Sequence, residues 1–243
     1  MCSVTWTRDA AGLHVFMNRD ERRTRAPERP PRVFVRDGVS RIAPEDGEAG
    51  GTWIAVNEHG VVVALVNGYL REDLARTDEP RSRGLLVRDL AAGSSSDDVV
   101  RRLGATDLSA VRSFRLLVLH PDDRGSVATW DGRSLEIASD AEPFCPLLSS
   151  SHAASAVAAA RLEAWNESVA LHGRDPDALE RYHAGHARGE SAYSVCMHRE
   201  DAETRSFVRV LVADTAASLT WSPGPPCRSR PGVRCSVQRV ASP

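Results

Sequence analysis

The residue with the clearest potential for chemistry is a cysteine at the second position, Cys2. A small second residue permits removal of Met1, which leaves Cys2 with a free α-amine beside its thiol. The pKa of such an amine is about 7.7–8.0, so a useful fraction is neutral near pH 7 and can accept the thiol proton. The sequence therefore predicts an amino-terminal cysteine nucleophile.

A predicted hairpin brings a charged segment beside this cysteine. Cys2–Thr7 and Leu13–Met17 have the composition of two short strands, joined by a turn centred near Ala10. In that register Cys2 lies across from about Asn18. A slip of one residue changes which side chains share a face with Cys2, so the residues leave the register open.

Three polar side chains have the chemistry to assist the thiol. The guanidinium of Arg19 would lower the thiol pKa, and the carboxylate of Asp20 would hold the α-amine by a charge-assisted hydrogen bond. Asn67 follows the apolar strand Val61–Val66 and would donate its amide N–H to the oxyanion. The alternative is an accidental cysteine next to a surface ion pair of little energetic value.

Several short motifs recur in order along the first third of the chain. They are Met1-Cys2, Asn18-Arg19-Asp20-Glu21, Gly50-Gly51-Thr52-Trp53, Ala64-Leu65-Val66-Asn67 and Ser82-Arg83-Gly84. With these motifs the sequence resembles the NRDE family, also called the transport-and-Golgi-organisation family, over roughly residues 1–90.

The resemblance implies an α+β fold of the amino-terminal-nucleophile (Ntn) type, a four-layer αββα sandwich of two antiparallel sheets. It also implies a distant relation to cysteine-dependent amide hydrolases such as choloylglycine hydrolases and penicillin V acylases. Cys2 would be the nucleophile, Arg19 and Asp20 would tune and orient it, and Asn67 would stabilise the oxyanion. We expect Asn18 and Trp53 to contact the substrate.

The expected function is hydrolysis of a non-peptide amide or related acyl bond in a small molecule, without a cofactor. The alternative is a non-catalytic protein that binds and carries haem, acyl-CoA or lipid in the same pocket. The amide hydrolases use a second asparagine as oxyanion donor, and its counterpart is unassigned here. Asn57 lies next to an expected turn and Asn166 inside an expected helix.

The remaining sequence is consistent with layers of strands and helices in one domain, residues 1–222. The Pro- and Arg-rich tail, residues 223–243, is expected to be loop or disordered. Further strands are expected at Arg32–Arg36, Ser40–Ile42, Thr52–Asn57, Phe114–His120, Ser126–Trp130, Ser134–Ala138, Ala192–His198, Arg205–Ala213 and Ser218–Trp221. Helices are expected at Ser82–Ala92, at Ala153–His172 and at Pro176–Ala187, and another is expected to start after Ser96, as its N-cap, and to run to Leu103-Gly104.

Composition excludes several classes of function. The sequence contains no lysine, so all 31 basic residues are arginine, and a Walker loop, a kinase ATP lysine and a Schiff-base lysine are excluded. A net charge of −2 gives no reason to expect nucleic acid as a partner. The apolar run Val61–Val66 is too short to span a membrane, and the first residues lack a secretion signal. We therefore expect a cytoplasmic location, and the all-arginine basic set suggests a GC-rich bacterial origin.

Cysteine and histidine spacing predicts no metal site. The five cysteines include no C-x-x-C pair, so neither a disulfide framework nor a zinc site is indicated. His183 and His186 share one face of an expected helix, where a solvated surface is the preferred interpretation. Cys145 and scattered histidines could ligate haem, but such residues are ordinary in a chain of this size.

Overall fold

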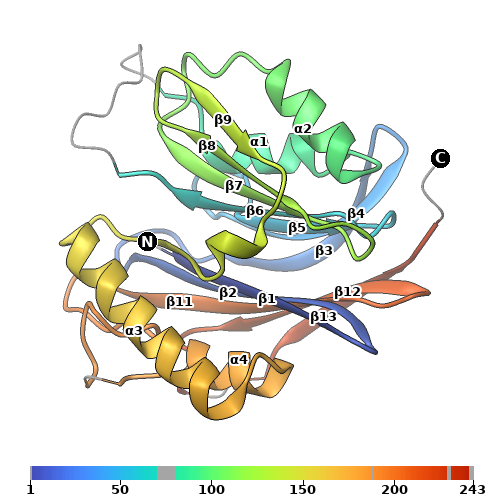
Figure 1. Ribbon diagram of the computed structural model, residues 1–243. Helices are drawn as coiled ribbons and strands as arrows, with labels where there is room; N and C mark the ends of the chain where they lie inside the picture. The colour runs from blue at the N-terminus through green and yellow to red at the C-terminus, as the bar shows by residue number, and fades with distance from the viewer. Residues whose placement is uncertain (1, 70–79, 188, 229–230, 241–243) are drawn as a thin grey trace.

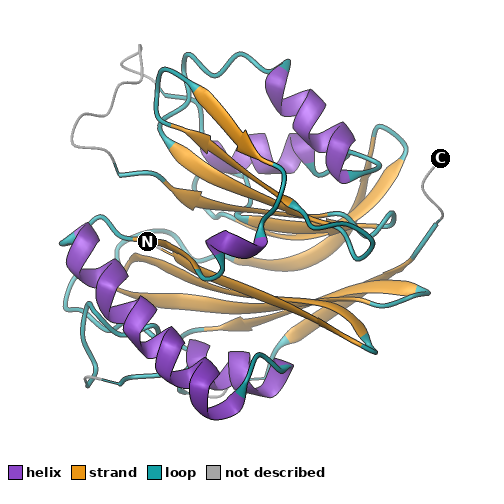
Figure 2. Ribbon diagram, in the orientation of Figure 1, coloured by secondary structure: helices purple, strands orange, loops and turns teal. Residues whose placement is uncertain are grey.

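The computed structural model describes residues 2–69, 80–187, 189–228 and 231–240. Two β-sheets lie face to face, and a layer of helices covers the outer side of each (Figures 1 and 2). This is the four-layer αββα sandwich predicted from the sequence, and the prediction of fold class is confirmed.

The first sheet contains the amino-terminal strand at an inner position. Every neighbouring pair of strands in it is antiparallel. Its order is β10 (Leu147–Ser149), β1 (Cys2–Asp9), β2 (Gly12–Arg22), β11 (Ala202–Val212), β12 (Ala216–Pro223) and β13 (Val233–Gln238).

The second sheet follows the chain order and is also antiparallel throughout. It is built from β3 (Arg29–Arg36), β4 (Val39–Glu45), β5 (Ile54–Asn57), β6 (Val62–Asn67), β7 (Phe114–Leu119), β8 (Ser126–Trp130) and β9 (Leu135–Ala138).

The helices divide between the two outer faces. Above the second sheet in Figure 1 lie α1 (Arg83–Leu90) and α2 (Ser96–Gly104), and below the first sheet lie α3 (Ala154–His172) and α4 (Pro176–His183). A short 3-10 helix, Glu142–Phe144, precedes β10. Asp175 caps α4 by accepting a hydrogen bond from the backbone N–H of Ala178.

Alternation of side chains along the strands produces three layers of core. The largest lies between the sheets and includes Val4, Trp6, Val15 and Leu117. A second core joins the second sheet to α1 and α2, and a third joins the first sheet to α3 and α4. Successive residues of β1 and β2 therefore face either the other sheet or the helices, which decides what each site residue contacts.

Three expected elements differ in the structure. Part of the tail expected to be loop or disordered forms β13, whose alternating residues pair along β12 from Trp221↔Val233 to Ala216↔Gln238. Ala192–His198 forms turns and bends instead of the expected strand. Helix α4 ends at His183, where Ala184 and Gly185 close the last turn through backbone hydrogen bonds.

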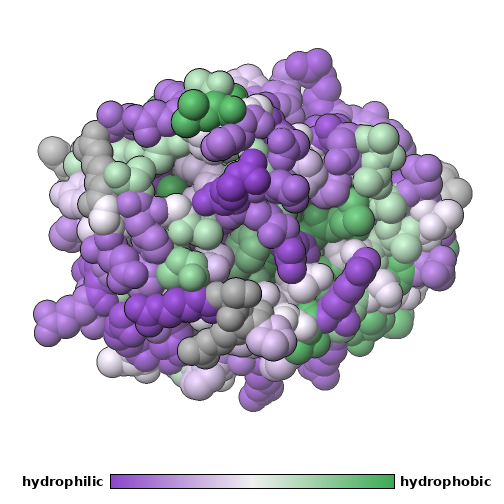
Figure 3. Space-filling view, turned by 90° about the horizontal axis from the view of Figure 1, so that it is seen from below, coloured by the Kyte–Doolittle hydropathy of each residue, from purple (hydrophilic) through white to green (hydrophobic). Residues whose placement is uncertain are grey.

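No helix among the described residues combines the length and apolar character needed to cross a membrane. The face seen from below, on the side of α3 and α4, is largely hydrophilic, with hydrophobic residues scattered among the hydrophilic ones (Figure 3).

Candidate active site

The register of the first hairpin places Cys2 directly opposite Arg19. The turn falls at Ala10 and Ala11, and Asp9 pairs with Gly12, which shifts the pairing by one residue from a turn centred on Ala10. Cys2 belongs to the core between the sheets, so its side chain faces that space.

In the same register, the side chain of Asn18 lies on the other face of the sheet. Asn18 lies opposite Ser3, is fully buried, and donates from Nδ2 to the carbonyl oxygens of His183 and Val195, both at 2.9 Å. Asn18 was expected to contact a substrate, but it is not among the residues that line the cavity containing Cys2, because these bonds commit its amide N–H groups to the helical layer.

Cys2 is held at the edge of the inter-sheet core with 7% of its surface exposed. Its backbone nitrogen donates a hydrogen bond of 3.1 Å to Oγ of Ser149 on the neighbouring strand β10. Burial raises the pKa of the Cys2 thiol, and the charge of Asp20 also raises it, while Arg19 and the backbone N–H of Asp20 lower it. The resting side chain is therefore a neutral thiol.

Arg19 is part of the cavity wall and is almost fully buried, with only 6% of its surface exposed. It donates to Glu28 Oε1 at 2.6 Å and to Asp46 Oδ2 at 2.5 Å, and its guanidinium stacks 4.5 Å from the centre of the Trp53 ring. Two carboxylates thus neutralise much of its charge, which limits how far Arg19 can lower the Cys2 pKa.

Trp53 is positioned by a close contact between two of the motifs found in the sequence. Thr52 donates its backbone N–H to the carbonyl oxygen of Gly84 at 2.9 Å, next to the start of α1. A Cβ atom on Gly51 would lie 2.3 Å from the carbonyl carbon of Gly84, so only glycine permits this approach. Trp53 and Ser82, the N-cap of α1, line the same cavity.

A cavity of about 270 Å³ brings most of the predicted site residues together. Cys2, Arg19, Trp53 and Asn67 line it, as does Asp20. Asn67 is half-buried at the end of β6 and donates from Nδ2 to the hydroxyl of Tyr69 at 3.2 Å. The cavity wall also includes Glu21, Arg25, Asp46, Ala49, Thr52, Leu65, Pro80, Arg81, Ser82, Arg83, Gly84 and Arg112.

The carboxylate of Asp20 takes part in a buried network with the helical layer. Arg161 of α3 donates to Asp20 Oδ2 at 3.0 Å and to Ser3 Oγ at 2.8 Å, and the ion pair is completely buried. Thr204 donates to Asp20 Oδ1 at 2.7 Å. These bonds fix the backbone of Asp20, whose N–H donates to the sulfur of Cys2.

Sequence reasoning missed Ser149 and Arg161, which come from segments far along the chain. Ser149 begins a run of three serines before an expected helix, which gives no sign of a strand, and an arginine on an expected helix gives no sign of burial. The two asparagines considered as second oxyanion donors lie elsewhere. Asn57 donates to the carbonyl oxygens of Ala91 and Gly93, and Asn166 is exposed on α3.

His183 is fully buried, which corrects the expectation of a solvated face for this histidine. Its Nε2 lies 2.9 Å from Thr5 Oγ1, and burial, with a smaller effect of Arg161, lowers its pKa to about 3. The pKa of this histidine is about 6.5 in the unfolded chain and about 3 in the folded chain. Between these two pH values the unfolded chain binds a proton that the folded chain does not.

The free energy of unfolding is therefore expected to fall as the pH drops below about 6.5, with a contribution from His183 of up to about 1.4 kcal/mol per pH unit. The variant His183→Gln should lose this part of the slope in urea unfolding measured from neutral pH downward. His172→Gln, at the exposed end of α3, is the matched control. Equal slopes in the two variants would refute the assignment.

Comparison with protein families gives a match to the model of the family described as Transport and Golgi organisation 2, over residues 1–203. The chain belongs to this family. The resemblance to the NRDE family predicted from the short motifs is therefore confirmed. No curated protein matches the sequence.

Solved structures show that this Transport and Golgi organisation 2 family member has the fold of Ntn hydrolases. Penicillin V acylase from Agrobacterium tumefaciens is 8% identical with a TM-score of 0.58, over 92% of this chain and 83% of that one. An N-acylethanolamine-hydrolysing acid amidase ortholog from Caenorhabditis elegans is 12% identical with a TM-score of 0.59, over 87% and 92%. A mutant of conjugated bile acid hydrolase from Clostridium perfringens is 8% identical with a TM-score of 0.58, over 98% and 92%.

Proposed function

We propose that this family member is a hydrolase of a non-peptide amide or related acyl bond, with Cys2 as its amino-terminal nucleophile. The observation that carries the proposal is the position of Cys2: its thiol lines a cavity, and its backbone nitrogen is held by Ser149. Removal of Met1 would turn that nitrogen into the α-amine. The structural neighbours are a penicillin V acylase, an acid amidase and a conjugated bile acid hydrolase, which supports the same class of reaction.

In the proposed reaction, the α-amine of Cys2 takes the thiol proton as the sulfur attacks the substrate carbonyl. The amine then gives this proton to the leaving nitrogen, the C–N bond breaks, and a thioester remains on Cys2. Water attacks the thioester and loses a proton to the same amine. The C–S bond breaks, the thiol is restored and a carboxylic acid leaves.

Two donors in the cavity wall are available to the oxyanion. The amide of Asn67 is one. The other is the indole N–H of Trp53, which is buried and has no hydrogen-bond partner among the described residues. We therefore assign to the indole N–H of Trp53 the role of second oxyanion donor, which an asparagine fills in the amide hydrolases.

The arginines of the cavity wall could bind an anionic group of a substrate. Five arginines line the cavity, of which Arg19 and Arg25 also pair with Asp46, and Arg81 pairs with Asp89. The amino-terminal end of α1 also borders the cavity at Ser82 and Arg83, and a helix N-terminus favours negative charge. An N-acyl amide that carries a carboxylate fits this wall.

The direct test is the state of the amino terminus. Intact-mass measurement is expected to show loss of Met1, and 2-cyanobenzothiazole, which condenses with amino-terminal cysteine, is expected to label the unfolded protein. Cys2→Ala should not be labelled, and Cys235→Ser should be labelled like the parent protein. Retention of Met1 in the purified protein would refute the mechanism.

The arginine-lined cavity also favours a second candidate, a carrier that binds an anionic ligand such as haem or acyl-CoA without turnover. A carrier would show a ligand-dependent rise in melting temperature with no product by mass spectrometry. The hydrolase would form product from an amide or acyl substrate and lose this activity with Cys2→Ala.

A further inference from the structure

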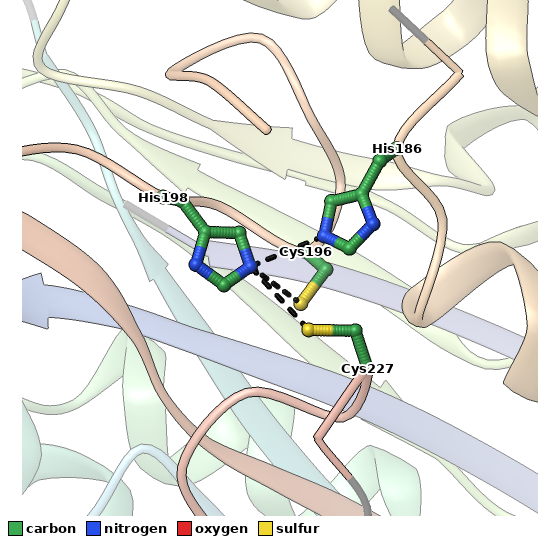
Figure 4. A group of neighbouring side chains, drawn as sticks. All are labelled: His186, Cys196, His198 and Cys227. Atoms are coloured by element: carbon green, nitrogen blue, oxygen red, sulfur yellow. Dashed lines mark hydrogen bonds between the residues drawn. The ribbon is translucent and has the colours of Figure 1, made fainter. Parts of the chain in front are cut away.

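A group of metal-binding side chains lies outside the proposed active site. It gathers residues from two stretches of chain, residues 186–198 and the segment around Cys227 (Figure 4). We call it the histidine–cysteine cluster, and its members are His186, Cys196, His198 and Cys227.

The ligand atoms of the cluster all lie within 4.8 Å of one another. From Nε2 of His198, Sγ of Cys196 is 3.6 Å away, Sγ of Cys227 is 3.4 Å away and Nε2 of His186 is 3.1 Å away. A tetrahedral zinc ion with bonds of about 2.3 Å to sulfur and about 2.0–2.1 Å to nitrogen holds sulfur and nitrogen about 3.5 Å apart, and two nitrogens about 3.4 Å apart. The measured distances between the ligand atoms of the cluster are close to these ligand–ligand distances.

Hydrogen bonding alone does not satisfy this arrangement. Nε2 of His198 has three polar neighbours at hydrogen-bond distance, as the dashed lines of Figure 4 show. An uncharged imidazole nitrogen carries either one hydrogen or one lone pair, so it makes one such bond well. A cation at the centre would accept a lone pair from every member of the cluster.

We propose that the histidine–cysteine cluster binds one Zn²⁺ ion in a tetrahedral site. Two sulfurs with two imidazole nitrogens form a common ligand set of structural zinc. As the ion binds, each thiol releases its proton to solvent, so the two thiolates balance the charge of the metal. Such a neutral site suits the position of Cys196, which is fully buried.

A carboxylate lies near the second ring nitrogen of one proposed ligand. Oε2 of Glu190 lies 3.9 Å from Nδ1 of His198, beyond hydrogen-bond distance. A shift of this exposed side chain to hydrogen-bond distance would orient a metal-bound His198 and strengthen it as a ligand.

The ion would fix chain segments that have little regular structure. Three members of the cluster lie in residues 184–201, between α4 and β11, where the described chain forms turns, bends and an isolated bridge. Cys227 lies in the connection between β12 and β13. Zinc would join these two connections, as structural zinc does where little apolar core is available.

The cluster is also linked to the buried network beside the active site. Met197, between two of its members, donates its backbone N–H to Thr204 Oγ1 at 2.8 Å, and Thr204 donates to Asp20. The carbonyl oxygen of Val195 accepts from Asn18. Zinc would thus hold the backbone that positions Asp20, without itself contacting the cavity.

The test measures metal in the full chain purified from zinc-containing medium. Elemental analysis is expected to find about one zinc per chain, and less than about a tenth of that in Cys227→Ser and in His186→Ala, since both remove a ligand. Cys235→Ser should keep the full amount, because its sulfur donates to the carbonyl oxygen of Pro31 on the other sheet. Cobalt added to the metal-depleted parent protein should give the absorption of a tetrahedral thiolate site.

Three results would overturn the proposal. One is an equal zinc content in the parent protein and Cys227→Ser. Another is a different metal bound in stoichiometric amount. The third is an intact mass and thiol count that reveal a disulfide between Cys196 and Cys227. None of these measurements depends on enzymatic activity, so the zinc proposal and the proposed hydrolase function fail independently.

Discussion

Replacing Cys2 by alanine is expected to lower the turnover of an amide substrate by at least about 10³-fold. The substitution removes the sulfur that forms the thioester in the proposed mechanism, and no other cysteine lines the cavity among the described residues. The measurement is product formation by mass spectrometry from a panel of N-acyl amides, with and without a carboxylate.

Two variants separate loss of the nucleophile from loss of the fold. Cys235→Ala removes a half-buried thiol on β13 and should leave turnover unchanged. Cys2→Ser keeps the α-amine and a hydroxyl but offers a poorer nucleophile, so a small residual rate is expected. All three variants should melt within a few degrees of the parent protein. Unchanged turnover in Cys2→Ala would exclude the proposed mechanism.

The pairing within the amino-terminal hairpin could be predicted from the sequence to within one residue. The two strand patterns and the short turn predicted that Cys2 would meet the Asn18–Glu21 segment, and the structure pairs Cys2 with Arg19. The side-chain period of a strand is two, so the shift from a turn centred on Ala10 decides the face of every residue. That shift puts Arg19 on the face of Cys2, beside the cavity, and Asn18 on the face covered by α3 and α4.

Long-range partners could not be predicted in the same way. Ser149 reaches Cys2 because β10 adds to the edge of β1, and a three-residue strand has no clear signal in sequence. In the histidine–cysteine cluster, the segment before β11 meets the segment after β12 because these two strands pair in the first sheet. Its Cys196-x-His198 spacing was the one local signal, and it fell in a segment expected to be a strand.

The buried pair of Arg161 and Asp20 predicts the largest change in stability. Both side chains are completely excluded from solvent, at a distance of 3.0 Å. Arg161→Met leaves the carboxylate buried without its cation, and a loss of about 3–5 kcal/mol in the free energy of unfolding is expected. Urea unfolding measures this loss, and Arg181→Met, the same change at an exposed position of α4, should stay within about 0.5 kcal/mol of the parent protein.

A double variant distinguishes a lost ion pair from lost packing. In Arg161→Met combined with Asp20→Asn the buried group is neutral, so part of the stability lost in Arg161→Met should return. Equal stability of Arg161→Met and Arg181→Met would show that the pair contributes nothing. The consequence for the site follows from the backbone of Asp20, whose N–H donates to the sulfur of Cys2. Because Arg161 and Thr204 hold the Asp20 carboxylate, α3 and β11 together help to fix the position of Cys2, the proposed nucleophile.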